Sequence, residues 1–208
     1  MDFLNSIILL TNFIIVPGIT YGSQLALGAI GVTLIYGVLR FANFAYGDLM
    51  AFGTMIVILV TWFLQSKGIT FGLLPTALLA LPVGILLTIA VSLFFDKTVF
   101  EYYRNKKSDP VTFIVVSLGI MFVLNAVVRI IIGPNDINFM DGHKFIMKAR
   151  EFKQMTGLNE GLALKSTQVI TLITTIITCS ILFYFLNKTK TGKSMRAYSN
   201  NEDLALLS

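Results

Sequence analysis

Apolar residues dominate this chain in five long runs, and shorter polar segments separate each run from the next. A helix crosses a hydrocarbon core of about 30 Å with roughly 20 apolar residues, because each residue adds about 1.5 Å. The pattern therefore predicts an all-α polytopic membrane protein with about five transmembrane helices. Their expected ranges are residues 19–39, 44–64, 71–95, 111–132 and 166–187.

The first uncharged run extends from residue 3 to residue 39 and would be roughly 55 Å long as a single helix, more than the bilayer core. Pro17-Gly18 is the expected break, because proline lacks a backbone donor and disfavours a helical residue before it. Residues 3–16 are then too few to span the membrane. We interpret them as a short interfacial or half-inserted N-terminal helix.

Prolines and charges define the remaining boundaries. Pro75 and Pro82 predict a kink or a break near the start of the third run. The charged segment 96–110 predicts a loop, and the mixed-charge segment 133–165 predicts an external loop or hairpin. The sequence thus predicts one transmembrane domain over residues 1–208.

The composition excludes several classes of protein. Hydrophobic residues make up 55% of the 208 residues and charged residues 13%, which excludes an ordinary soluble domain. The net charge of +5 is assigned to short loops that orient the spans, so no nucleic-acid partner is expected. The density of Lys and Arg near the span ends places residues 188–208 in the cytoplasm and the N-terminus outside. A single cysteine, Cys179, excludes an intramolecular disulfide, and no metal or cofactor is expected.

Several polar side chains occur at or near membrane depth, where they need partners or water. Asn43, Tyr46 and Asp48 cluster between the first two spans. Asn125 and Arg129 are one turn apart on the fourth span, and we interpret Arg129 as a structural residue that snorkels. The threonines of the fifth span are expected to bond their own backbone.

Three stretches carry a resemblance to a known family. The first is Tyr36-Gly37 followed by NFAYGD at residues 43–48, and the second, residues 111–134, contains SLG and ends in IGP. The third is TGKSMRA at residues 191–197, continuing through residue 207. In this order and spacing they resemble the LivH-type permease subunits of branched-chain amino acid ABC importers. The third stretch is not a P-loop, because Asn187 stands where the upstream glycine is required.

The resemblance implies an ATP-driven importer that moves branched-chain amino acids across the bacterial inner membrane. The chain would then be a transport subunit and not an enzyme, with ATP hydrolysis on separate ABC ATPase subunits. The other implied partners are a second permease subunit of the LivM type, a periplasmic substrate-binding protein and membrane lipid.

The resemblance also implies two sets of site residues. The substrate path would be lined by Gln24, Asn43, Phe44, Tyr46, Gly47 and Asp48. A helix over residues 196–207 would couple the chain to the ATPase through Gly192, Arg196, Ala197, Asn200, Leu204, Ala205 and Leu207, with Glu202 and Asp203 at its rim. For the first set, structural glycines and a helix-terminating Asn-Asp pair explain the same residues. For the second set, the alternative is an ordinary membrane-surface helix.

Two departures from the family pattern are visible. Tyr46 replaces the family histidine, which argues against a mechanism that binds a proton there. The chain ends at Ser208, where the family continues with further spans, so we expect an N-terminal part of a permease.

Other functions are less well supported by the sequence. A permease of the same family that carries urea or short amides remains an alternative, since the signature does not encode the cargo. A passive channel would need no coupling segment. An intramembrane enzyme lacks HExxH and GxSxG motifs, and the one histidine, His143, falls in a loop.

Overall fold

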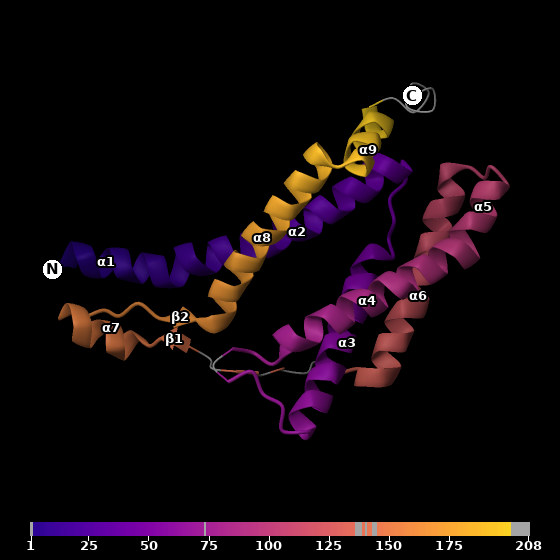
Figure 1. The fold of residues 1–208 in the computed structure, drawn as a ribbon. Helices are drawn as coiled ribbons and strands as arrows, with labels where there is room; N and C mark the ends of the chain where they lie inside the picture. Colours follow the sequence, from indigo (N-terminus) through magenta and orange to yellow (C-terminus); the bar gives the residue numbers. More distant parts are fainter. Residues whose placement is uncertain (1, 73, 136–138, 140, 143–144, 201–208) are drawn as a thin grey trace. The chain divides into compact units, whose positions relative to one another are not determined.

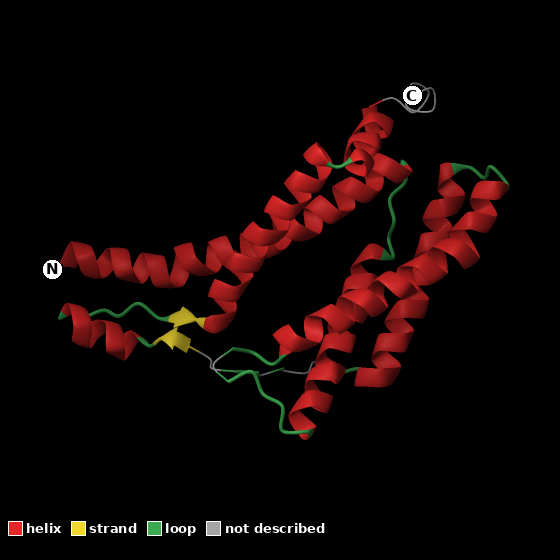
Figure 2. Cartoon of the chain, in the orientation of Figure 1, coloured by secondary structure: helices red, strands yellow, loops and turns green. Residues whose placement is uncertain are grey.

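The computed structural model describes residues 2–72, 74–135, 139, 141–142 and 145–200. The chain is an all-α polytopic membrane protein, and five helices among these residues are long and apolar enough to cross a membrane (Figures 1 and 2). They are Phe3–Leu39, Tyr46–Ser66, Ala77–Asn105, Pro110–Ile132 and Ser166–Lys188. The five predicted spans are therefore confirmed, although several of them begin or end at other residues than predicted.

The chain divides into two compact units. The first unit comprises Met1–Val38 and His143–Ser208, and the second comprises Leu39–Gly142. The elements of the first unit are α1 (Asp2–Leu10), the π-helical turn η1 (Thr11–Ile15), α2 (Val16–Leu39), β1 (Phe145–Met147), α7 (Ala149–Thr156), β2 (Leu164–Lys165), α8 (Ser166–Lys188) and α9 (Lys190–Asn200). The elements of the second unit are α3 (Tyr46–Ser66), α4 (Ala77–Phe95), the π-helical turn η2 (Asp96–Phe100), α5 (Glu101–Asn105) and α6 (Pro110–Ile132).

The predicted break at Pro17-Gly18 is wrong, because α1, η1 and α2 follow one another as a continuous helix. The widened turn η1 comes directly before Pro17, and in it the amide of Val16 donates to the carbonyl of Thr11, five residues back. A proline ring clashes with the carbonyl four residues earlier in a regular α-helix. The carbonyl that Pro17 would meet, that of Phe13, lies inside this π-helical turn, so the helix widens instead of ending.

The N-terminal helix is bonded to the segment before β2, which pairs antiparallel with β1. Asn12 in η1 donates from Nδ2 to the carbonyl of Gly161 (3.4 Å) and accepts from the amide of Ala163 (3.3 Å). Asn5 in α1 accepts from the amide of Glu160 (3.4 Å). These three bonds hold the first turns of the long N-terminal helix against the segment that leads into β2.

The third span begins later than predicted, at Ala77, and residues 71–76 are not helical. The break expected near Pro75 is confirmed, whereas Pro82 lies inside α4. Asp141 stabilises the start of α4, because Oδ2 accepts from the amide of Ala77 (2.6 Å) while Oδ1 accepts from Nε2 of Gln65 (3.0 Å). A carboxylate at a helix N-terminus satisfies an otherwise unpaired amide and complements the helix dipole.

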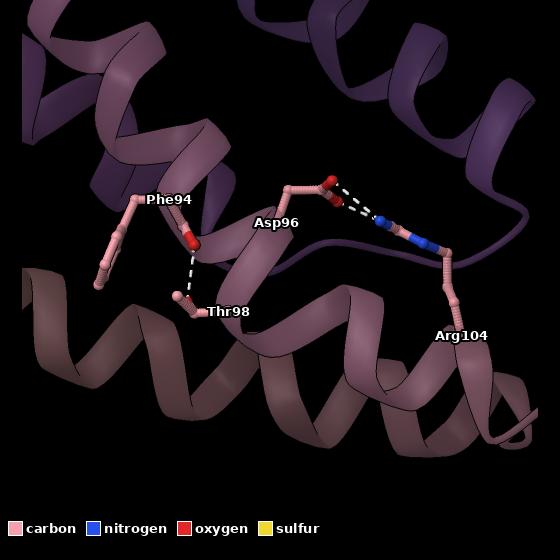
Figure 3. Close-up of polar contacts among 4 residues, drawn as sticks. All are labelled: Phe94, Asp96, Thr98 and Arg104. Carbon is pink, nitrogen blue, oxygen red and sulfur yellow. Dashed lines mark hydrogen bonds and ion pairs between the residues drawn. The ribbon is translucent and has the colours of Figure 1, made fainter.

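The predicted loop 96–110 is also corrected, since the helix continues through η2 and α5 to Asn105. Figure 3 shows the reason: Asp96 accepts two hydrogen bonds from Arg104, at 2.7 and 2.9 Å, and Thr98 donates to the carbonyl of Phe94. Two of the charges that suggested a loop, Asp96 and Arg104, are thus paired along one helix. Glu, Lys and Arg also have good helix propensity, which the charge pattern alone does not reveal.

Two close approaches hold α3 and α4 together in the second unit. A side chain at Gly53 would meet Oγ1 of Thr88 at 2.7 Å, and one at Gly84 would meet a methyl group of Val57. Small residues at such positions let helix backbones approach closely inside a membrane. The buried core of this unit consists of Phe41, Ala45, Phe100, Ile120 and Leu124.

Candidate functional site

The segment between α2 and α3 is non-helical and partly buried. Phe41 is 8% exposed, and its ring centroid lies 5.8 Å from that of Phe100 and 5.1 Å from that of Phe113. Ala45, at 1% exposure, belongs to the same core. These two aromatic contacts pack Phe41, just before the NFAYGD motif, against η2 and α6.

Hydrogen bonds satisfy the backbone of this segment. The amide of Phe44 donates to Oγ of Ser117 on α6 (3.1 Å), and the amide of Ala45 donates to Oδ1 of Asn43 (3.1 Å). The amide of Tyr46 donates to the carbonyl of Asn43 (3.3 Å). Irregular backbone is tolerated at membrane depth only where such partners exist. Asn43 thus supports the turn that begins α3, as the structural interpretation proposed.

Three polar side chains form a continuous hydrogen-bonded chain between α3 and α6. Asn125 donates from Nδ2 to Oδ1 of Asp48 (2.9 Å), and its own Oδ1 accepts from Nε of Arg129 (2.8 Å). We call Asp48, Asn125 and Arg129 the polar chain. The amide of Asn125 separates the acid from the base, so each charge is satisfied on one side by a neutral group.

A cavity of about 270 Å³ lies beside the polar chain. All three residues of the polar chain line it, together with apolar side chains of α3 and α6 and with Gly133, Pro134 and Asn135. A carboxylate and a guanidinium therefore face a single hollow at the C-terminal end of α6.

A second hollow, of about 470 Å³, lies between α3 and α4. It is lined by aliphatic side chains, by Gly53 and Gly84, and by Thr54 and Thr88. Both threonines donate to the carbonyl four residues earlier in their own helix, at 3.0 and 2.7 Å. Their hydroxyls are thus engaged by backbone, and the groove offers mainly apolar surface.

The predicted substrate-path residues differ in their surroundings. Gln24 is exposed on α2 in the first unit. In the second unit, Tyr46 is half-buried at the start of α3, Phe44 is 51% exposed, and the space around Gly47 is open. Asp48 is the predicted path residue that the structure places in the polar chain and beside the cavity.

The sequence did not reveal that Asn125 and Arg129 form a hydrogen-bonded chain with Asp48. Their i, i+4 spacing inside an apolar span was visible, and an intramembrane charge is by default a functional signal. The missing information was the partner on α3, seventy-seven positions away from Asn125. Ser117 was noted only as part of a motif, and no sequence signal assigned its bond to the amide of Phe44.

The corner between α8 and α9 contains the predicted coupling residues that the structure describes. Gly192 is buried, and a side chain there would collide with the carbonyl of Phe185 and lie 2.6 Å from Cα of Leu186. The amide of Gly192 donates to Oγ1 of Thr189 (3.0 Å). Arg196 donates from Nη1 to Oδ1 of Asn187 (2.9 Å), so it bonds back to α8.

The predicted coupling helix begins earlier than residue 196, since α9 starts at Lys190. Arg196 and Ala197 are exposed on it, while Ser199 faces α2, where a side chain at Gly37 would meet its Oγ at 3.3 Å. Asn200 ends the described helix. Glu202, Asp203, Leu204, Ala205 and Leu207 lie outside the described residues.

The threonines of α8 bond their own helix, as predicted. Thr171, Thr174 and Thr175 donate to the carbonyls of Thr167, Ile170 and Thr171 at 2.7–2.8 Å. Within the described ranges, no group of three or more His, Cys, Asp or Glu residues could hold a metal ion.

Comparison with known proteins gives consistent matches. The family model described as "Branched-chain amino acid transport system / permease component" matches residues 14–208. The high-affinity branched-chain amino acid transport system permease protein LivH of Escherichia coli K12 is 26% identical over 195 residues, which cover 92% of this chain and 59% of that protein. LivH of Salmonella typhimurium is 25% identical and BraD of Pseudomonas aeruginosa 24% identical, with the same two coverages. The chain thus spans 59% of the length of these curated relatives. No solved structure gives a significant match.

Proposed function

Because the chain belongs to the branched-chain amino acid transport permease family, we propose that it is the membrane-spanning subunit of an ATP-driven importer for branched-chain amino acids. The observation that carries the proposal is the family match over residues 14–208, which includes both the signature around Asp48 and the segment on α9. The subunit itself performs no chemistry on its cargo. ATP is hydrolysed by separate ABC ATPase subunits.

The geometry of the second unit supports a transport role. Polar groups are costly in hydrocarbon, and ionisable residues inside spans usually serve a function. The carboxylate, amide and guanidinium between α3 and α6 therefore support a functional site. The non-helical connection between α2 and α3, at residues 40–45, comes just before Asp48 and offers further polar groups beside them. We place the cargo path along α3 and α6, with Gln24, Asn43, Phe44, Tyr46, Gly47 and Asp48 as its candidate residues.

The corner at Gly192 supports an ATPase contact on α9. The close approach of Gly192 to α8 and of Ser199 to α2 fixes α9 against these two helices of the first unit. A force applied to α9 is therefore transmitted to two membrane-spanning helices. Arg196 and Ala197, on its exposed side, are available to an ATPase groove, and Asn200, Leu204, Ala205 and Leu207 are the further candidate coupling residues.

This assignment sets the remaining partners and the orientation. Residues 188–208 lie in the cytoplasm of a bacterium, next to the inner membrane, and the N-terminus lies in the periplasm. A substrate-binding protein delivers the amino acid from the periplasm. A second permease subunit, of the LivM type, completes the passage.

Charge reversal on α9 tests the coupling. Arg196→Glu together with Ala197→Glu should lower ATP-dependent leucine uptake by the assembled transporter about 30-fold or more, because interface hot spots contribute 2 kcal/mol or more. Arg150→Glu together with Gln154→Glu, on the exposed surface of α7, makes the same change in charge and should leave uptake unchanged. Normal uptake by the α9 variant, in correctly inserted protein, would exclude α9 as the ATPase contact.

A further inference from the structure

We infer that the cavity beside the polar chain is a binding site for the zwitterionic head of an α-amino acid. In this site Arg129 binds the carboxylate and Asp48 binds the ammonium group. The inference rests on the proposed function and deepens it, since it assigns the charged ends of the cargo to two particular residues.

The hydrogen-bond pattern leaves each charge with capacity for a ligand. Asn125 contacts Arg129 at Nε and Asp48 at Oδ1, through bonds of 2.8 and 2.9 Å. Among the hydrogen bonds of the described residues, none joins Nη1 or Nη2 of Arg129 or Oδ2 of Asp48. A guanidinium binds a carboxylate with two parallel N–H groups, and a carboxylate oxygen accepts readily from an ammonium group.

The arrangement differs from that of a purely structural ion pair. A direct salt bridge would neutralise both charges and would often be no more stable than apolar packing. Here one carboxamide keeps the acid and the base apart and prevents direct contact. That spacing suits a ligand whose own two charges are attached to a single carbon atom.

The size of the cavity fits the same ligand class. Its volume of about 270 Å³ lies just below the ~300–1,000 Å³ that drug-sized ligands occupy. Aliphatic side chains form a further part of its lining, including Ile58, Val128 and Ile132. The walls therefore offer apolar contacts to a branched side chain while the polar chain orients the head group.

A cysteine placed in the cavity wall measures occupancy directly. Val128→Cys is introduced into the assembled transporter after Cys179→Ala has removed the native thiol, and the rate of labelling by a small thiol reagent is followed. Leucine should slow the labelling, whereas leucinol, which lacks the carboxylate, should not. Arg129→Gln should raise the leucine concentration for half-protection about 10- to 100-fold, because a hydrogen bond to a charged group contributes about 1.5–3 kcal/mol.

Variants separate charge recognition from folding. Arg129→Lys keeps the positive charge and should retain part of the protection, and Lys67→Gln, at the far end of α3, should retain all of it. Asn125 is a positioning residue, and Asn125→Asp would pair with Arg129 directly. That variant should lose protection by leucine and should react faster with a cationic reagent than with an anionic one, a change in charge preference that misfolding would not produce.

The outcomes distinguish this inference from the proposed function. ATP-dependent leucine uptake without protection at Val128→Cys, or with protection that survives Arg129→Gln, overturns the zwitterion site and leaves the importer intact. Equal protection by leucinol or urea overturns the assignment of Arg129 to a carboxylate. Absence of leucine uptake by the unmodified transporter, with uptake of urea, overturns the proposed cargo itself.

Discussion

The carboxamide of Asn125 on α6 donates to the carboxylate of Asp48 on α3 over 2.9 Å. This bond joins two spans inside the second unit, and Arg129 extends it by one further turn of α6. The bond shows where the family signature packs along α6. Asp48 at the start of α3 lies beside the second half of α6, and the non-helical residues before it lie beside Ser117, earlier on the same helix.

Removal of the central amide should destabilise the second unit. Asn125→Ala leaves Asp48 without its partner, and an unsatisfied polar group away from water costs about 1–3 kcal/mol, more when charged. Thermal unfolding of the purified protein in detergent measures the loss. Asn105→Ala, at the exposed end of α5, serves as the control and should change the free energy of unfolding little. Equal stability of the two variants would contradict the bridging role of Asn125.

Ser117 should be needed for the order of the segment before α3. Ser117→Ala removes the acceptor of the Phe44 amide, which should then exchange its hydrogen faster, at a cost of about 1–3 kcal/mol. Hydrogen exchange with mass spectrometry over residues 40–48 reports the change. Ser180→Ala removes only a bond to the carbonyl of Ile176 in the same helix and is the matched control. Unchanged protection at Phe44 in Ser117→Ala would remove the basis for this role.

The packing of α3 on α4 should depend on Gly84. A methyl group there would overlap the side chain of Val57, and overpacking costs about 1–3 kcal/mol. Gly119→Ala on α6 meets nothing within 4 Å, so it should be neutral or stabilise by up to about 1 kcal/mol through helix propensity. In a denaturation assay, Gly84→Ala should lower the free energy of unfolding, whereas Gly119→Ala should leave it unchanged or raise it. Tolerance of Gly84→Ala would show that the two helices can separate at no cost.

The corner at Gly192 should not accept alanine. The new Cβ would meet backbone atoms of Phe185 and Leu186, which cannot move aside as a flexible side chain can. We expect Gly192→Ala to open the corner, to expose the amide of Lys193, which donates to the carbonyl of Thr189, and to reduce coupled uptake. Gly18→Ala, which meets nothing within 4 Å on α2, is the control for hydrogen exchange and for uptake. Identical exchange at Lys193 in both variants would argue against a fixed corner.

The five spans and the family could be predicted from the sequence, because both depend on long apolar runs and on the order of short motifs. The helix ends could not. Pro17 indicated a break, yet a π-helical turn before it carries the helix through. The charges of residues 96–105 indicated a loop, yet Asp96 and Arg104 pair along one helix.

The candidate site was predictable only in part. Asp48 stood out as an isolated carboxylate at the start of a span, and Asn125 and Arg129 stood out as an i, i+4 pair. Nothing in the sequence joined the two groups, because the bond depends on how α3 packs against α6. Asp141 was overlooked for the same reason: its partners Gln65 and Ala77 belong to helices far away in the sequence.

We propose that this chain belongs to a transporter that moves a branched-chain amino acid inward at the expense of ATP. The most direct test of this proposal is the accumulation of radiolabelled leucine in liposomes that contain the purified transporter, with its binding protein supplied at the periplasmic face and ATP at the other. We expect leucine to accumulate against its concentration gradient, and this accumulation should require both ATP and the binding protein. Leucine equilibration that is independent of ATP, or accumulation of urea in place of leucine, would contradict it.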